Sequence, residues 1–326
     1  MDTFLLCDEA WLSTPPPTPG YCNNVESYSS SSLYTSKEEC EQAFSIYFEK
    51  ELTYMPQQGY LEHLHFKNLF SARFRAIQWL IKSRSRLDLS FITLFNAVNY
   101  FDRFVSINQC KGWRHWMVEL LSVACLSVAT KFTETFTPTL YEIQMEELDH
   151  SFESITIQRM ELMLLKALGW RLCSTTAYSY VELLMMNIEV PLKPHLQKDF
   201  VDRVNQLLLE AILDCKLMEY QPSIVAVSAV WCGLEELLPS KSDTQIAYIK
   251  GFFDQNRKNE IIKCHKIMEE KMANGNLLNY CPSSPVTVLL TEEKIDVYDT
   301  QIDLSLFQVS NTDTESSNKR RKREVS

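Results

Sequence analysis

The sequence predicts an all-α protein, and its glycine content and apolar spacing carry that prediction. Only 7 of 326 residues are glycine, about 2% where the average is about 7%. Tight hairpins and phosphate-binding loops depend on glycine, so the deficit disfavours β-sandwiches, Rossmann folds and P-loops. From about residue 36 to residue 274, apolar residues recur at helical spacing. This length and a 45% hydrophobic content are enough for about two domains, each with its own hydrophobic core.

The helices are expected to follow one another in two sets of five, after an N-terminal helix. That first helix should begin near Ser36, which forms a capping-box pattern with Glu39. The first set is predicted at about 67–83, 90–106, 113–132, 139–148 and 153–168. The second set is predicted at about 175–187, 196–213, 221–238, 243–254 and 257–273.

Both ends of the chain have compositions typical of disordered tails. Residues 1–36 include four prolines between positions 15 and 19 and a serine run from 29 to 32, which cannot build a core. Residues 275–326 are acidic and rich in Ser and Thr, and they end in a basic cluster. The resulting domains are 1–36, 37–173, 174–274 and 275–326.

Composition also limits the compartment and the partners. The ten cysteines include no C-x-x-C pair, and no signal peptide opens the chain, so we expect free thiols in a reducing interior. The longest apolar stretches, 120–129 and 224–234, are too short to span a bilayer, which predicts a soluble protein without a membrane partner. Without residues 319–326, which hold five bases and one acid, the net charge of −10 becomes −14. Direct nucleic-acid binding is therefore not expected.

Two charged residues border apolar helix faces. Lys131 continues the apolar stripe of the third predicted helix of the first set, and Glu161 lies within the stripe of the fifth. Each should face water, a partner or a functional surface, because a lone desolvated charge is costly. Two simpler explanations stay open: Lys131 can complement the helix dipole, and Glu161 can occupy an exposed flank.

A second pair of charges is expected to be structural. Arg73 heads an apolar stripe in the first helix of the set, and Asp102 continues one in the second. An ion pair between these helices explains both residues without a ligand.

Four segments in order resemble the cyclin box, and most closely that of the plant D-type cyclins. They are residues 72–79 (ARFRAIQW), 98–104 (VNYFDRF), 121–132 (LSVACLSVATKF) and 157–161 (IQRME). The resemblance covers 37–173 closely and 174–274 more loosely. It implies two tandem five-helix cyclin-box domains with an N-terminal helix.

The resemblance also implies a function without catalysis by the chain itself. Lys131 and Glu161 match the charged pair that cyclins present to the C-helix region of a cyclin-dependent kinase, and Phe132 and Glu134 are expected to contribute to that surface. Arg73 and Asp102 match an internal ion pair. The implied role is activation of the kinase and its direction to a retinoblastoma-related protein at the G1/S transition. No cofactor is expected, and kinase inhibitor proteins are further candidate partners.

The sequence departs from the family pattern in two places. Many cyclins have an acidic residue two positions after the lysine, where this chain has Thr133 before Glu134. At the positions of the substrate-docking patch, Ala72 and Ala76 replace the usual Met and Leu while Trp79 is retained. The usual docking groove is therefore in question.

The tails carry short motifs. Leu5, Cys7 and Glu9 fit L-x-C-x-E, by which D-type cyclins bind retinoblastoma-family proteins, and in an extended chain these side chains share one face. The basic cluster reads as a nuclear-import signal, so we expect a nuclear protein that is also found in the cytoplasm. Thr14, Thr18 and Ser284 precede prolines and are candidate phosphorylation sites, although such dipeptides are common in linkers. The cluster consists of Lys319, Arg320, Arg321, Lys322 and Arg323.

Two other classes of function remain as alternatives. An enzyme is disfavoured because no H-E-x-x-H, G-x-S-x-G or Gly-rich phosphate loop is present, and His63 and His65, two positions apart, diverge on a helix; no metal site is expected. A cyclin-box protein acting in transcription is disfavoured by the acidic body and the L-x-C-x-E segment.

Overall fold

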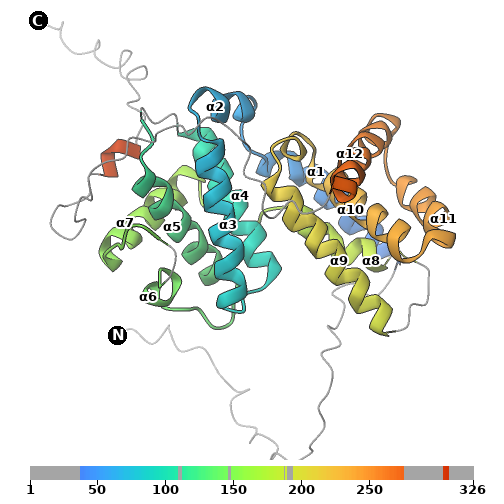
Figure 1. Ribbon diagram of the computed structural model, residues 1–326, viewed down its shortest axis with the longest axis horizontal. Helices are drawn as coiled ribbons and strands as arrows, with labels where there is room; N and C mark the ends of the chain where they lie inside the picture. Colours follow the sequence, from blue (N-terminus) through green and yellow to red (C-terminus); the bar gives the residue numbers. More distant parts are fainter. Residues whose placement is uncertain are drawn as a thin grey trace, which may run out of the picture. The chain divides into compact units, whose positions relative to one another are not determined.

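The computed structural model describes residues 37–108, 112–145, 148–186, 188, 194–274 and 304–307. All regular structure in this part of the chain is helical, which confirms the all-α prediction (Figure 1). The first half contains α1 (Lys37–Glu51), η2 (Leu52–Tyr54), α2 (Tyr60–Phe66), α3 (Phe70–Arg86), α4 (Phe91–Ile107), α5 (His115–Thr133), α6 (Leu140–Ile143) and α7 (Ser154–Ala167). The second half contains η3 (Ala177–Tyr180), α8 (Val181–Met186), α9 (Pro194–Leu213), η4 (Leu217–Glu219), α10 (Pro222–Leu237), α11 (Pro239–Lys250), α12 (Gln255–Asn274) and η6 (Leu304–Phe307).

The first hydrophobic core is built around α5. This helix packs against α3, α4, α6 and α7, and every residue from Met117 to Thr130 is buried. α5 is also long and apolar enough to cross a membrane, but 78% of its most apolar 18-residue window is buried inside the protein. It is therefore the central helix of the first unit.

The second core repeats this plan around α10, which packs against α8, α9, α11 and α12. Gly233 lies inside α10, where glycine usually weakens a helix. A Cβ at this position would meet the Phe200 ring at 3.1 Å and the Val204 side chain at 3.3 Å. The glycine therefore allows α9 to approach α10 closely.

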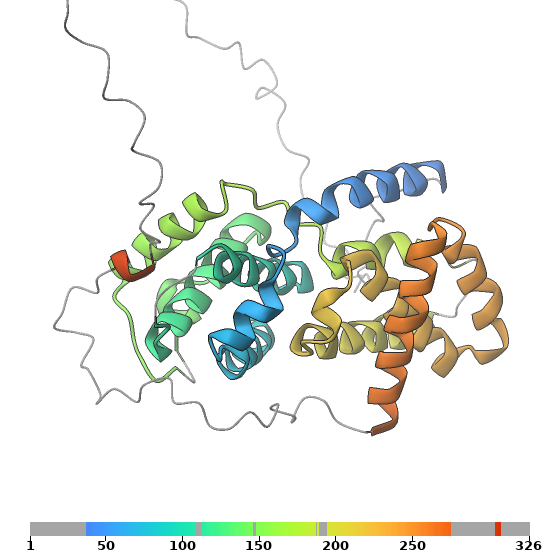
Figure 2. The ribbon, with the colours of Figure 1, turned by 90° about the horizontal axis from the view of Figure 1, so that it is seen from above.

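The N-terminal helix α1 packs in the second core, although its sequence position placed it with the first domain. Phe44 is 2% exposed and stacks on Phe252, with ring centroids 5.3 Å apart. Helices α8 and α10 are its main neighbours (Figure 2). Chain order could not predict this, because an amphipathic helix packs against whichever apolar surface it can reach.

Glu51, the last residue of α1, is fully buried in this contact. Its carboxylate accepts hydrogen bonds from Tyr180 Oη (2.9 Å), Ser223 N (3.1 Å) and Ser223 Oγ (3.1 Å), and it lies 3.5 Å from Arg257 Nη2. Burial raises the pKa of Glu51 despite these partners.

Several helix boundaries differ from the sequence prediction. Helix α2 was not predicted, because only Tyr60 and Leu64 of its seven residues are buried. The helix expected at 139–148 is a single turn, and the side chain of Gln144 closes the following loop by bonding the backbone N and O of Phe152. The segment expected at 175–187 divides into η3 and α8. Helix α11 begins four residues early because Pro239 occupies its first turn.

One short segment of the expected acidic tail is helical. In η6, Phe307 is fully buried, and its ring lies 5.8 Å from that of Trp113 and 6.1 Å from those of Phe104 and Trp116. Leu304, at i−3, is also buried. The disorder expectation for 275–326 therefore fails at these four residues, since an i, i+3 apolar pair finds a place on the first core.

Candidate functional site: a charged pair among exposed apolar side chains

Lys131 and Glu161 come together as an ion pair between α5 and α7. Lys131 Nζ lies 2.7 Å from both carboxylate oxygens of Glu161. Ser127 Oγ, one turn earlier on α5, donates to Glu161 Oε1 at 2.5 Å. Three donated bonds thus hold the Glu161 carboxylate in one orientation.

The two members of this pair differ in exposure. The Glu161 side chain is 11% exposed, whereas the Lys131 side chain is 49% exposed. The mid-helix position of Glu161 is tolerated because Lys131 and Ser127 compensate its burial. The simple explanation of Glu161 as an exposed flank residue is therefore wrong.

Large apolar side chains are exposed on α5, on α7 and on the segment between them, which contains α6. Six of the thirteen large exposed hydrophobic residues in the described part of the chain fall between positions 132 and 162. Helix α6 packs against both α5 and α7 (Figure 1). We call these residues the apolar surround: Phe132 (47% exposed), Phe136 (89%), Tyr141 (72%), Met145 (55%), Ile155 (65%) and Leu162 (45%).

Of the two further residues expected at this surface, Phe132 is exposed but Glu134 is engaged within the chain. Glu134 Oε1 accepts from Ser90 N at 2.8 Å and from the Thr93 hydroxyl, at the start of α4. Burial raises the pKa of Glu134, but the bonds from Thr93 and Ser90 outweigh it, and the net pKa is lowered. The geometry gives Glu134 a capping role in α4.

Arg73 and Asp102 form the predicted ion pair between α3 and α4. Arg73 Nε and Nη2 donate to the two oxygens of Asp102 at 2.7 and 2.8 Å, and Tyr60 Oη donates to Asp102 at 2.8 Å. Burial acts to lower the pKa of Arg73, but Asp102 reverses this, so the pKa is raised. Tyr60 is a partner that the sequence did not reveal, because it lies on the unpredicted helix α2.

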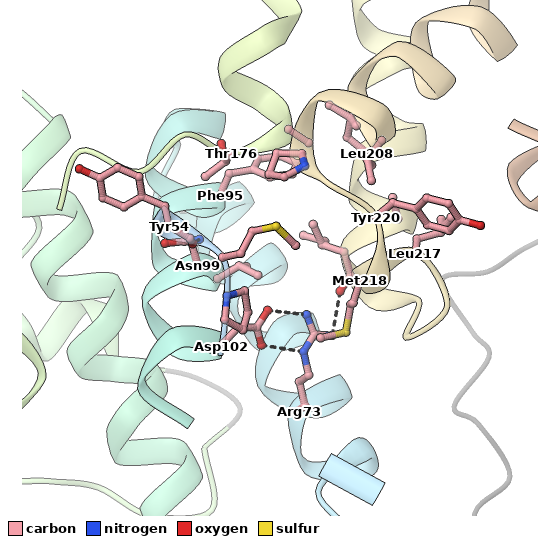
Figure 3. Close-up of a pocket in the computed structure, with 18 residues that line it drawn as sticks. Tyr54, Arg73, Phe95, Asn99, Asp102, Thr176, Leu208, Leu217, Met218 and Tyr220 are labelled. Atoms are coloured by element: carbon pink, nitrogen blue, oxygen red, sulfur yellow. Dashed lines mark hydrogen bonds and ion pairs between the residues drawn. The ribbon is translucent and has the colours of Figure 1, made fainter. Parts of the chain in front are cut away.

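The same arginine connects the two helical units. Arg73 Nη1 donates to the backbone carbonyl of Ile212 at the end of α9, at 2.9 Å. Figure 3 shows the ion pair at one side of a cavity of about 130 Å³, whose other walls include Phe95, Leu208 and Met218. The ion pair therefore fixes a junction to which both units contribute side chains.

The three residues at the positions of the family's docking patch are buried. Ala72 is 3% exposed, Ala76 6% and Trp79 6%. They line a second cavity of about 110 Å³ together with His115 and Glu119 of α5. A concave site exists here, and its lining includes charged side chains that the sequence did not indicate.

The tail motifs lie outside the described residues. These are the L-x-C-x-E segment, the residues before prolines and the basic cluster: Leu5, Cys7, Glu9, Thr14, Thr18, Ser284, Lys319, Arg320, Arg321, Lys322 and Arg323.

Sequence reasoning missed most of the apolar surround, although a signal was present. Ile155 and Leu162 are seven residues apart in α7, which places them on one face. They lie off the buried stripe of Ile157, Met160 and Leu164. Apolar residues in excess of one stripe on a surface helix are a sign of an interaction surface.

Comparison with known proteins agrees with this architecture. Residues 42–173 match the model of the cyclin N-terminal domain, and residues 175–282 match that of the cyclin C-terminal domain. Cyclin-D1-1 of Arabidopsis thaliana is 31% identical over 240 residues, covering 73% of this chain and 70% of that protein. Cyclin-D2-2 of Oryza sativa subsp. japonica is 31% identical over 255 residues, covering 75% and 69%. Putative cyclin-D7-1 of the same plant is 42% identical over 146 residues, covering 44% and 41%. With both cyclin domains present in order, the chain belongs to the cyclin family and, within it, to the plant D-type cyclins.

Proposed function

We propose that this cyclin is a noncatalytic subunit that binds and activates a cyclin-dependent kinase and directs it to a retinoblastoma-related protein at the G1/S transition. The observation that carries the proposal is the Lys131–Glu161 pair between α5 and α7, with Lys131 half exposed and the apolar surround on these helices and the segment that joins them. The nuclear-import cluster at 319–323 supports a nuclear site of action.

The pair has hydrogen-bonding capacity left for a partner. The Lys131 ammonium carries three N–H donors, and its contacts with Glu161 use two of them. A partner helix has backbone N–H groups without partners in its first turn and backbone carbonyls without partners in its last turn. Lys131 can donate to such a carbonyl, and a Glu161 lone pair can accept from such an N–H.

The apolar surround supplies the hydrophobic contact area that tight binding requires. Large apolar and aromatic side chains around a polar centre exclude water from it, and they contribute most of the affinity at many interfaces. Phe136 and Tyr141, which are the most exposed aromatic side chains of the surround, are the expected anchors. An amphipathic helix of the kinase is the kind of element that fits this surface.

Activation follows from what a docked helix does inside a kinase. An active kinase needs the glutamate of its C-helix paired with its catalytic lysine, and its activation loop ordered. A cyclin surface that binds the C-helix only in its inward position shifts the kinase toward the active state. The cyclin needs no catalytic residue for this.

The first test is reconstitution with candidate plant cyclin-dependent kinases and a pocket-protein substrate. We expect the Lys131→Ala, Glu161→Ala double variant to bind the kinase at least tenfold more weakly and to lose activation. Lys263→Ala, at an exposed position of α12, is the matched control and should behave as wild type. Full binding and activation by the double variant would reject the assignment of this surface.

The pocket-protein claim is tested separately. The Cys7→Ala, Glu9→Ala variant should lose pull-down of the retinoblastoma-related protein while kinase binding stays unchanged, because the motif precedes the first helix and is separate from the Lys131–Glu161 pair. Unchanged pull-down would remove this part of the proposal and leave kinase activation standing.

A further inference from the structure

A cluster of two histidines and two acidic residues lies at the start of α5, away from the Lys131–Glu161 pair. His115 and Glu119 are four residues apart in α5, so both side chains project from one face. The loop between α6 and α7 brings Asp149 and His150 against them. His115 Nε2 lies 2.7 Å from Asp149 Oδ2 and 3.3 Å from Glu119 Oε1.

Three of these side chains have the donor set of a transition-metal site. One ligand atom each from His115, Glu119 and Asp149 lies within 4.8 Å of the other two, and this is the one such group of three among the described residues. Zn²⁺ binds imidazole nitrogen and carboxylate oxygen at about 2.0–2.2 Å, which places tetrahedral ligand atoms about 3.3 Å apart. The distance from His115 Nε2 to Glu119 Oε1 already has this value.

Glu119 is held in position by its surroundings. It is 7% exposed, and its two oxygens accept from the backbone N–H groups of Asp149 (2.9 Å) and His150 (3.2 Å). The His150 ring contributes a further contact, with Nδ1 2.6 Å from Glu119 Oε2. Such outer contacts orient a carboxylate ligand and are typical of metal centres.

Another histidine–carboxylate contact in the protein provides a contrast. His265 Nε2 lies 2.9 Å from Glu235 Oε2 on neighbouring helices, but no third ligand completes a group there among the described residues. That pair is explained as a simple hydrogen bond, whereas the three-membered cluster places two carboxylates against one imidazole nitrogen.

We propose that His115, Glu119 and Asp149 bind one Zn²⁺ ion. The ion would replace the hydrogen bond between His115 Nε2 and Asp149; the neutral imidazole then carries its proton on Nδ1 and offers the Nε2 lone pair to the metal. A fourth position is left for water on the exposed side, because the Asp149 side chain is 74% exposed. The sequence predicted no metal site because it has no C-x-x-C or H-E-x-x-H motif and because His63 and His65 diverge on a helix. Such motifs could not reveal this cluster, since Asp149 is thirty residues from Glu119.

The ion would have a structural consequence. It would tie the loop before α7 to the first turn of α5, beside the cavity lined by Ala72, Ala76 and Trp79. It would also neutralise Glu119 and Asp149, the two carboxylates in the cavity lining. The charge presented to anything entering this cavity would therefore depend on zinc.

The test is titration of the full chain with ZnCl₂ under reducing conditions, followed by calorimetry and by thermal unfolding. We expect one site in the wild type and a higher melting temperature with zinc. Asp149→Asn and His115→Ala should each weaken binding by about 10- to 100-fold and lose the thermal shift. His65→Ala removes an exposed histidine of α2 and should bind zinc as the wild type does.

Two outcomes would overturn the proposal. Equal zinc affinity in the wild type and in both ligand variants would place the ion elsewhere, on thiols for example. An equal thermal shift with MgCl₂ would show a general acidic site, because Mg²⁺ prefers oxygen ligands and does not need the imidazole. Asp149→Asn changes a mostly exposed side chain, so this variant is expected to fold. If His115→Ala does not fold, the zinc affinity of Asp149→Asn alone decides the test.

Discussion

At the scale of single residues, this protein uses carboxylates to hold helix ends as well as to present charge. Glu134 and Glu161 both lie beside the end of α5, yet only Glu161 belongs to an ion pair at the exposed surface. Glu134 instead accepts two bonds at the N-terminus of α4, where the helix dipole also favours negative charge. The sequence distance of Glu134 from Lys131 could not predict this role, because it does not show that the start of α4 lies within hydrogen-bonding distance of Glu134.

Glu134→Gln tests this capping role through pH. The pKa of Glu134 is lowered in the folded state, so its ionised form stabilises the fold above its unfolded pKa of about 4.3. That contribution is lost as pH falls through the lowered folded value. We expect the variant to be less stable by about 1 kcal/mol at pH 7 and to lose less stability than wild type between about pH 5 and pH 3. Urea unfolding across this range measures both; parallel pH profiles would contradict the assignment.

At the scale of elements, the sequence predicted most helices and failed where tertiary contacts decide. Helices α4, α5 and α7 lie within a few residues of their predicted ranges, since their buried stripes are regular. α2 is too short for its two buried residues to form a period. η6 was hidden because one buried i, i+3 apolar pair in an acidic tail gives no signal until the neighbouring Trp113 and Trp116 rings are known. The docking of α1 on the second core likewise depends on contacts distant in sequence.

Glu51→Ala tests the attachment of α1. The change leaves the Tyr180 hydroxyl and the Ser223 N–H and hydroxyl without their acceptor in a buried site. We expect a loss of about 2–4 kcal/mol of unfolding free energy. Glu49→Ala, at an exposed position of the same helix, should change stability by no more than about 0.5 kcal/mol. Chemical denaturation followed by circular dichroism compares the two, and similar small losses would show that Glu51 does not anchor the helix.

At the scale of the whole molecule, Arg73 and Asp102 link local folding to the arrangement of the two units. The sequence predicted the pair itself, since both residues head or continue an apolar stripe. It could not predict that Arg73 also bonds Ile212, 139 residues away. The sequence likewise could not predict the proposed zinc site, because the loop before α7 brings Asp149 to His115 and Glu119 only in the folded protein.

Asp102→Ala tests this central link. It leaves Arg73 buried without its counter-charge and removes the acceptor of Tyr60. We expect a loss of about 3–5 kcal/mol, measured by urea unfolding. Asp202→Ala, at an exposed position of α9, is the control and should be nearly neutral. A cost below about 1 kcal/mol for Asp102→Ala would show that the ion pair is not what secures the junction.

Presentation of the Lys131–Glu161 pair to a kinase can be tested by exchanging the two charges. The Lys131→Glu, Glu161→Lys variant keeps opposite charges across α5 and α7, so it can retain the internal pair, but it reverses the charges offered to a partner. Helical circular dichroism establishes that the variant is folded, and calorimetry measures its dissociation constant for the kinase. We expect the variant to bind the kinase at least tenfold more weakly than the wild type. Wild-type affinity in the folded variant would contradict it, because the pair would then serve the fold alone.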